Sequence, residues 1–212
     1  MLTVVLLLLV GAIVGEGAKP SEQEHPKRLD HTIYVSQAHW SNNELTLIFY
    51  HRHYYKLKGL SGITPFKGSL PTDKWTPDSF YVNAVSVELM NKGMISGDSD
   101  GTIKTSQMFK IKVPCELTAA IFIKTRGTVN CTVQIESYRY TENDIMQSWQ
   151  PGSGAFRASE LIAGLKGYAT NQHMMSLSTG TYARLSFSLE IHSGITVAVL
   201  ESQFKKFLKE NT

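Results

Sequence analysis

Apolar and polar residues alternate along most of the chain beyond residue 31, and alternation with a period of two predicts β-strands. Between residues 183 and 191, for example, Ala, Leu, Phe, Leu and Ile alternate with Arg, Ser, Ser and Glu. Such one-sided alternation is typical of antiparallel sheets that bury one face. By this criterion we expect about eight strands, over residues 32–37, 44–50, 79–90, 109–113, 117–124, 129–136, 183–191 and 195–199.

Two such sheets packed face to face predict an all-β protein, an antiparallel β-sandwich that is jelly-roll-like. Helical patterning is sparse. Residues 201–210 place two phenylalanines and a leucine on one stripe opposite lysines, which predicts a short C-terminal helix. Residues 156–166 are long enough for about two or three helical turns. The connections 57–78 and 139–160 are rich in Gly, Pro, Ser and Thr, and binding loops tend to occur in such segments.

The N-terminus carries an apolar run over residues 2–14, which is too short to span a bilayer comfortably. Gly15 and Gly17 suit the small positions of a cleavage site, so residues 1–17 predict a signal peptide. A buried strand or a short anchor is the alternative. We therefore expect a secreted, extracellular protein.

The remaining chain is expected to form one domain. Residues 18–30 are polar and contain two prolines, which predicts a flexible lead-in before a single β-sandwich domain over residues 31–212. The chain has 212 residues, 42% hydrophobic and 18% charged, and this size allows a substantial core. Its formal net charge of +3 is modest, so no nucleic-acid partner is expected.

Two further features agree with export. The sequence Asn130-Cys131-Thr132 is a sequon and predicts glycosylation of Asn130. Cys115 and Cys131 allow one disulfide in an oxidising compartment. If residues 124–128 form a tight turn, Cys131 lies opposite a position near residue 120, and a direct disulfide would be strained. A disulfide and two buried thiols therefore both remain open.

The stretch Gly97-Asp98-Ser99-Asp100-Gly101 matches the G-x-S-x-G pattern of a serine-hydrolase elbow, which must be followed by a helix. Alternating residues follow it instead and predict a strand. An EF-hand starting at Asp98 fails because Ile103 and Phe109 occupy the positions of its glycine and glutamate. A hairpin turn is favoured, and an irregular calcium site at Asp98 and Asp100 is the weaker alternative.

Motifs of enzymes are missing from the sequence. It contains no P-loop, Rossmann fingerprint, H-E-x-x-H or C-x-x-C, and no pair of carboxylates stands out as an acid and a base. We therefore expect a protein that is not an enzyme and uses no cofactor.

One basic and aromatic stretch is a candidate binding site, because aromatic faces stack on sugars and arginine binds anions. It is interpreted as an edge for a glycan, a phosphate group or a protein partner, and a solvated strand is the alternative. His51 and His53 also have a spacing that metals use, with His39 as a third ligand. The stretch comprises Tyr50, His51, Arg52, His53, Tyr54, Tyr55 and Lys56, and runs on to Lys58.

Several segments together resemble the tumour necrosis factor and complement globular-head superfamily. Residues 109–115, 117–123 and 129–138 are similar to its central strands, and residues 185–199 are similar to its penultimate hairpin. The resemblance implies a jelly-roll homotrimer that binds a receptor or another extracellular partner through its loops.

These patterns lead to the hypothesis of a secreted, non-enzymatic binding protein, cytokine-like or receptor-binding. The alternative is a defence protein, such as a lectin or toxin, that binds carbohydrate or membrane surfaces through residues 50–58. A secreted hydrolase that uses Ser99 is a third, weaker hypothesis.

Overall fold

The structure is a computed structural model that describes residues 25–62, 64–70, 74–115, 117–118, 121, 126–152 and 154–194. Within this part of the chain we find no apolar helix of membrane-spanning length. The described residues form twelve strands: β1 (Arg28–Ser41), β2 (Glu44–Ser61), β3 (Phe66–Gly68), β4 (Ser79–Tyr81), β5 (Ser86–Leu89), β6 (Met94–Gly97), β7 (Asp100–Pro114), β8 (Thr128–Ser137), β9 (Met146–Trp149), β10 (Phe156–Ala158), β11 (Leu165–Leu177) and β12 (Gly180–His192).

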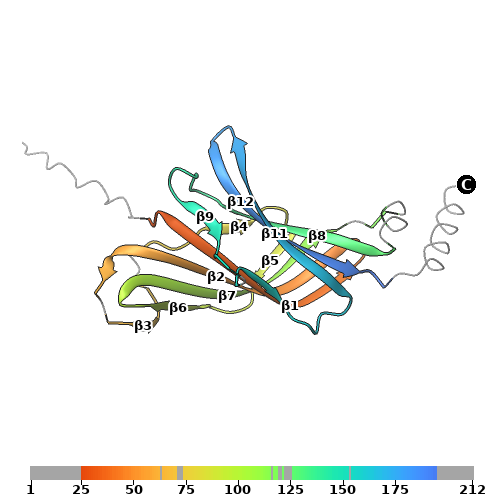
Figure 1. Cartoon of the computed structure of the whole chain (residues 1–212), viewed down its shortest axis with the longest axis horizontal. Coiled ribbons are helices and arrows are strands. Elements are labelled where there is room, and N and C mark those ends of the chain that lie inside the picture. The colour runs from red at the N-terminus through yellow and green to blue at the C-terminus, as the bar shows by residue number, and fades with distance from the viewer. Residues whose placement is uncertain are drawn as a thin grey trace, which may run out of the picture.

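The strands form two packed sheets (Figure 1). The larger sheet has the order β10-β1-β2-β7-β6-β3, with β5 also paired to β7 and β9 to β1. The smaller sheet has the order β11-β12-β8-β4 and lies across the larger one. Only β9 and β10 pair in parallel, both with β1, and the other described pairs are antiparallel. The predicted antiparallel β-sandwich is therefore confirmed.

The main core lies between the two sheets and follows from the alternation. On β2, every second side chain around Phe49 is fully buried, and on β12 the same holds around Phe187. The rings of Phe49 and Phe187 meet edge to face, with their centroids 5.9 Å apart. Buried aromatic pairs of this kind add about 0.5–1.5 kcal/mol to the stability gained from burial alone. A second cluster, around Tyr55 and Trp75, fills the interior beyond the main core.

The helix expected over residues 156–166 is wrong. Residues 156–158 form β10, in which Phe156 is buried and pairs with Ile33 of β1. The amide of Ile33 donates to the Ala155 carbonyl at 2.9 Å, so the backbone of this segment is used by the sheet. Short turns then lead to β11.

The lead-in expected over residues 18–30 extends too far, because Arg28 already begins β1 and Leu29 is buried. The expected signal peptide over residues 1–17, the strand over 195–199 and the C-terminal helix over 201–210 lie outside the described residues.

The structure joins Cys115 and Cys131 in a disulfide, with their Cα atoms 5.3 Å apart. Cys115 directly follows β7 of the larger sheet, whereas Cys131 lies in β8 of the smaller sheet. The strain expected from the sequence assumed that both residues lie in one hairpin, and this assumption was wrong. The bond connects the two layers instead. Asn130, beside it on β8, is exposed, and its glycosylation stays a prediction.

Residues 97–101 form the turn between β6 and β7. The amide of Gly101 donates to the Asp98 carbonyl at 3.0 Å, and Gly101 has a φ of 81°, which favours glycine. Asp98 pairs with Lys104 at 2.7 Å, and Asp100 pairs with Lys56 at 2.9 Å. The hydrogen bond from Lys56 is the main cause that lowers the pKa of Asp100 to about 2. Both carboxylates are therefore neutralised by lysines of the protein.

The disulfide leads to a stability prediction. Replacing both cysteines in the variant Cys115→Ala/Cys131→Ala should lower the free energy of unfolding by about 3 kcal/mol. The reason is that the disulfide closes the loop between Cys115 and Cys131 and so restricts the unfolded chain. Urea denaturation, with and without a reductant, measures this change. The reductant should lower the midpoint of the wild type and leave the variant unchanged. Equal midpoints for oxidised wild type and variant would contradict the prediction.

Candidate ligand-binding site

The loop that follows β8 begins and ends at hydrogen-bonded turns. Asp78, which precedes β4, accepts a hydrogen bond from the Ser137 hydroxyl at 2.7 Å. Asp144 accepts from both the amide and the hydroxyl of Thr141, at 2.9 and 2.8 Å. Aspartates stabilise turns in this way by satisfying backbone N–H groups. The β8–β9 loop, residues 138–145, is therefore anchored to its surroundings at each end.

This loop presents an aromatic pair to solvent. Tyr138 is 79% exposed and Phe80 on β4 is 36% exposed, so neither ring serves the core. Their centroids are 5.9 Å apart and their planes meet at 81°, an edge-to-face arrangement. Aromatic faces carry negative potential, so such a pair attracts cations such as an ammonium group.

A buried ion pair lies beside these rings on the outer face of the smaller sheet. Glu136 on β8 pairs in register with Phe80, and its carboxylate accepts a charge-assisted hydrogen bond from the Arg184 side chain of β12. Arg184 also donates to the amide oxygen of Gln134 at 3.4 Å. Glu136 is almost fully buried and Arg184 is only slightly more exposed. Because the two charges neutralise each other, the sheet can bury them at the edge of the site.

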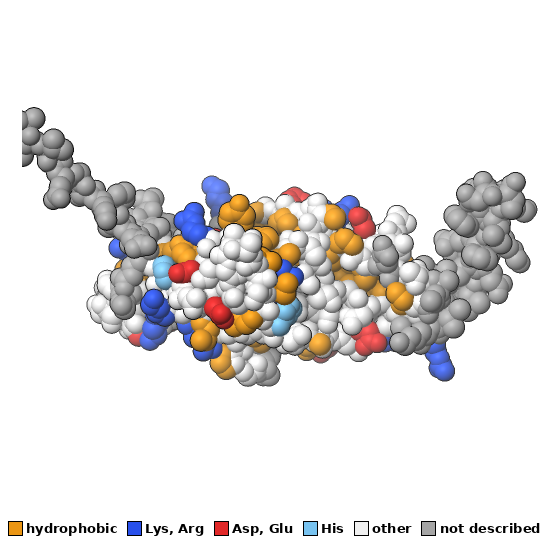
Figure 2. Space-filling view, turned by 90° about the horizontal axis from the view of Figure 1, so that it is seen from above, with side chains coloured by type: hydrophobic (Ala, Val, Ile, Leu, Met, Phe, Trp, Pro, Cys, Tyr) orange, Lys and Arg blue, Asp and Glu red, His pale blue; other side chains and the backbone are white. Residues whose placement is uncertain are grey.

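The hairpin formed by β11 and β12 projects from the body of the molecule next to this loop (Figure 1). Two contacts hold its tip: the Glu142 amide donates to the Thr181 carbonyl at 2.9 Å, and Gly180, which directly follows the turn of the hairpin, packs closely against Thr141. Within the hairpin, the Tyr182 hydroxyl donates to Thr179 at 3.2 Å. Seen from above, hydrophobic side chains lie exposed on the face from which the hairpin projects (Figure 2).

Together these groups form the aromatic site, which we define as Phe80, Glu136, Tyr138, Tyr182 and Arg184. It combines exposed aromatic rings, a neutralised ion pair and hydroxyl groups beside a projecting hairpin. Such a surface suits a small polar ligand that carries a positive charge. The alternation of apolar and polar residues does not reveal this site. A usable signal was present in Ser137-Tyr-Arg-Tyr140. Its aromatic residues directly follow a strand whose alternating pattern predicts that one of its faces is buried.

The candidate stretch from Tyr50 to Lys56 does not form one surface. It lies in β2, which is a central strand between β1 and β7 rather than an edge. Its side chains alternate between the two faces of the sheet. Outside, the Arg52 guanidinium lies 5.9 Å from the centre of the Tyr50 ring, and Tyr54 and Lys56 also lie on this face. Inside are His51, His53 and Tyr55.

The inward-facing residues create a buried histidine cluster, which we define as His31, His51 and His53. His31 Nδ1 lies 2.9 Å from His51 Nε2. His51 Nδ1 lies 3.0 Å from the Tyr81 hydroxyl, and His53 Nδ1 lies 3.0 Å from the Thr105 hydroxyl. The expected third histidine, His39, is exposed and is not part of the cluster. His31 was missed because it is far away in sequence and meets His53 only through the pairing of β1 with β2.

Burial determines the charge of this cluster. Desolvation lowers the pKa of each histidine well below the ordinary value of 6.5, and the pKa of His53 falls to about 3. The neighbouring rings lower the pKa of His31 and His51 further. All three imidazoles are therefore neutral at physiological pH.

The neutral cluster predicts that the protein becomes less stable in mild acid. Below about pH 6.5 the unfolded chain binds protons that the folded cluster does not accept until about pH 3, so stability falls through this range. For His53 alone the loss between pH 7.5 and pH 5 should be about 2 kcal/mol. Urea denaturation at these two pH values should show a smaller loss for His53→Gln than for wild type. The exposed-site variant His39→Gln should keep the full loss, and equal losses in all three proteins would contradict this account.

The fold agrees with comparisons to known proteins. The sequence model of the neurotransmitter-gated ion-channel ligand binding domain matches residues 23–199. The chain therefore belongs to this family of ligand-binding domains. AChBP from Bulinus truncatus, whose crystal structure was described as revealing the conserved scaffold of nicotinic acetylcholine receptors, has a similar fold. The TM-score is 0.63 at 15% identity, over 81% of this chain and 90% of AChBP.

Curated relatives are receptor subunits. The chain is 27% identical over 186 residues to the gamma-aminobutyric acid receptor subunit beta-like of Drosophila melanogaster. This match covers 84% of this chain and 37% of that subunit. It is 25% identical over 193 residues to the human gamma-aminobutyric acid receptor subunit rho-3, over 84% of this chain and 41% of that subunit. The chain thus spans about two fifths of the length of these relatives.

The family membership corrects the functional interpretation of the sequence. The resemblance to the tumour necrosis factor and complement superfamily is wrong, and so are the jelly-roll, cytokine-like and lectin or toxin hypotheses. The comparisons support neither a trimer nor a glycan partner. Both folds bury alternate residues of two antiparallel sheets, so the period-two pattern cannot distinguish them.

Two broader expectations agree with the family. It is a family of ligand-binding domains rather than of enzymes, as expected from the missing catalytic motifs. An extracellular location also agrees with membership in the family of neurotransmitter-gated ion-channel ligand binding domains.

Proposed function

We propose that this chain is the extracellular ligand-binding part of a neurotransmitter-gated ion-channel subunit, anchored to a membrane through other segments of the receptor. The relatives are named as receptor subunits and are more than twice as long as the matched region, which supports this proposal. The ligand is a small amine that binds at the aromatic site.

The observation that carries the proposal is the exposed edge-to-face pair of Phe80 and Tyr138 beside the ion pair of Glu136 and Arg184. Gamma-aminobutyric acid, for which the relatives are named, carries an ammonium group and a carboxylate at neutral pH. The aromatic faces suit the ammonium group. The projecting β11–β12 hairpin borders the ligand on one side.

Binding of gamma-aminobutyric acid to the full chain, measured by titration calorimetry, tests this site. Tyr138→Ala should weaken the affinity about 3- to 30-fold, because it removes one cation–π contact. Tyr138→Phe keeps the ring and should bind nearly as well as wild type. Tyr34→Ala is the matched control, since it removes a half-buried tyrosine from the larger sheet. The site is disproved if Tyr138→Ala binds as tightly as wild type, or if Tyr34→Ala loses as much affinity.

The same proposal includes assembly with further copies of the chain, since the relatives are subunits. Val87 and Leu89 on β5 are both exposed, together with Val85 and Met94 nearby. Among the described strands, β5 pairs only with β7, so its other edge is open to a neighbour. An exposed apolar group at a strand edge is typical of a surface that a partner covers.

Light scattering coupled to size-exclusion chromatography measures this assembly. We expect a concentration-dependent oligomer for the wild type and a monomer for Val87→Glu/Leu89→Glu. The control Leu161→Glu changes a single, highly exposed leucine elsewhere and should leave the oligomer intact. A wild type that stays monomeric at every concentration, or equal disruption by the control, would count against assembly through β5.

A further inference from the structure

The buried histidine cluster has the arrangement of a metal site. His31 comes from β1 and His51 and His53 come from β2, and one ligand atom of each lies within 4.8 Å of the other two. The ring centroids are 4.2 to 5.1 Å apart. An ion with zinc–nitrogen bonds of about 2.0–2.1 Å would separate its ligand nitrogens by about 3.4 Å. This separation lies between the 2.9 Å distance from His31 Nδ1 to His51 Nε2 and the 4.8 Å within which all the ligand atoms lie. Small ring rotations would therefore bring the three nitrogens to the spacing that the ion needs.

Two buried nitrogens of the cluster have no hydrogen-bond partner. Nε2 of His31 and Nε2 of His53 are both buried without a hydrogen bond. Buried polar atoms are usually satisfied, because leaving one unpaired is unfavourable by about 1–3 kcal/mol. The amide oxygen of Gln147 is a third unpaired atom in the interior. The Gln147 side chain lies beside His31.

The surrounding groups orient the rings for a metal. Metal-binding histidines usually direct their second nitrogen to an oxygen, which fixes the ring and its tautomer. Here Nδ1 of His51 contacts the Tyr81 hydroxyl and Nδ1 of His53 contacts the Thr105 hydroxyl. Both rings therefore direct Nε2 into the cluster. For His31, Nδ1 faces His51, and Gln147 is the oxygen available to Nε2.

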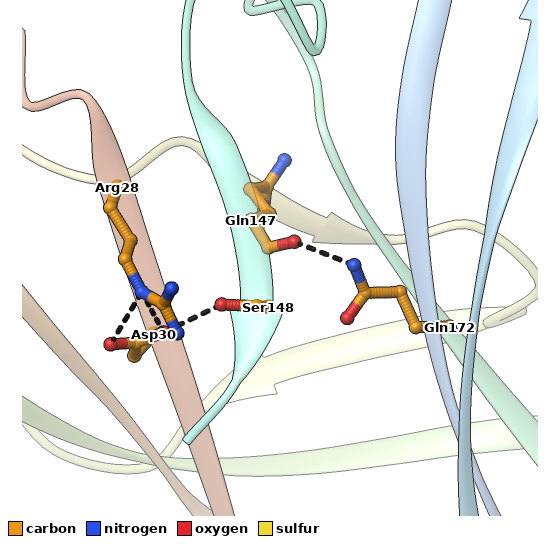
Figure 3. A network of polar contacts seen from close by, with 5 residues as sticks. All are labelled: Arg28, Asp30, Gln147, Ser148 and Gln172. Carbon is orange, nitrogen blue, oxygen red and sulfur yellow. Dashed lines mark hydrogen bonds and ion pairs between the residues drawn. The ribbon is translucent and has the colours of Figure 1, made fainter. Parts of the chain in front are cut away.

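Gln147 is held firmly enough for this role. It lies in β9, where its backbone carbonyl accepts from the Gln172 side chain at 3.2 Å (Figure 3). The adjacent Ser148 donates to Asp30 of β1 at 2.6 Å, and Asp30 also pairs with Arg28. The network connects β9 to both sheets, so Gln147 is fixed next to His31 by its neighbours.

We propose that His31, His51 and His53 bind a single transition-metal ion, with Zn²⁺ as the physiological candidate. Three imidazoles without a carboxylate select zinc, copper or nickel rather than calcium or magnesium. A cavity of about 210 Å³ borders the cluster at His53, Thr105 and Gln107, and we expect the ion to enter from it. Besides these small ring rotations, binding requires that the proton shared by His31 and His51 moves to the outer nitrogen of its ring. The ion joins β1 to β2 deep in the domain, independently of the aromatic site.

Titration of the chelator-treated full chain with Zn²⁺ tests the proposal. We expect one ion per chain by calorimetry and a thermal unfolding midpoint that rises with zinc concentration. Co²⁺, used as a spectroscopic probe, should show the visible bands of a tetrahedral ion. Thr105→Val, which removes an orienting hydroxyl without touching the metal, should weaken zinc binding about 10- to 100-fold, and His53→Gln should weaken it more.

The controls are His39→Gln and His173→Gln, which change exposed histidines of the two sheets and should bind zinc as the wild type does. If His53→Gln fails to fold, Thr105→Val still decides the question. Zinc binding as tight as that of the wild type in His53→Gln or Thr105→Val, or a loss of binding in His39→Gln, would overturn the assignment. So would a wild type whose unfolding midpoint does not respond to excess Zn²⁺. A failure here leaves binding of gamma-aminobutyric acid unaffected, so the two proposals fail separately.

Discussion

Strand β2 is hydrogen bonded to a neighbouring strand on each side. This constraint determines on which face of the sheet each of its side chains lies. A central strand can direct its residues only to one face or the other, in strict alternation. Phe49 therefore enters the core between the sheets, and His51 and His53 continue the same row into the interior. Tyr50 and Arg52 face outward. A shift of one residue in the pairing with β1 would exchange these two sets, so the core and the histidine cluster depend on the same register.

The aromatic site depends on the smaller sheet in a comparable way. Tyr81, next to Phe80 on β4, is directed to the core, which leaves Phe80 on the outer face. The same alternation directs Ile135 inward and Glu136 outward, and Leu185 inward and Arg184 outward. Three neighbouring strands thus contribute one residue each to a row across the sheet, and the β8–β9 loop adds Tyr138 at its end.

The fold class could be predicted because alternation is a local property of the chain. The strand expected over residues 129–136 and the one over 183–191 both lie within observed strands. Alternation could not reveal which sheet each strand joins, and for this reason the path between Cys115 and Cys131 was misjudged. Contacts between distant segments were also out of reach. His31 becomes a neighbour of His53 only when β1 and β2 pair, and no spacing in the sequence encodes that.

The family was misidentified for a related reason. Apolar strands that meet at tight turns occur in many sandwiches, so the hairpin over residues 185–199 matched a superfamily to which the chain does not belong. The site residues were obscured in a different way. Phe80 and Tyr138 look like core residues in the sequence, because aromatic side chains are usually buried, and only their positions on the outer face and in a loop expose them.

The attachment of the tip of the β11–β12 hairpin has a mechanical consequence. Gly180 packs so closely on Thr141 that a larger side chain would collide there, and the Glu142 amide is bonded to Thr181. These contacts connect the hairpin to the loop that carries Tyr138. A hairpin that tilts toward or away from a ligand must carry this loop with it or break the bond. The tip of the hairpin and the β8–β9 loop therefore move together, and closing over a small molecule would displace the segment that leads directly into β9.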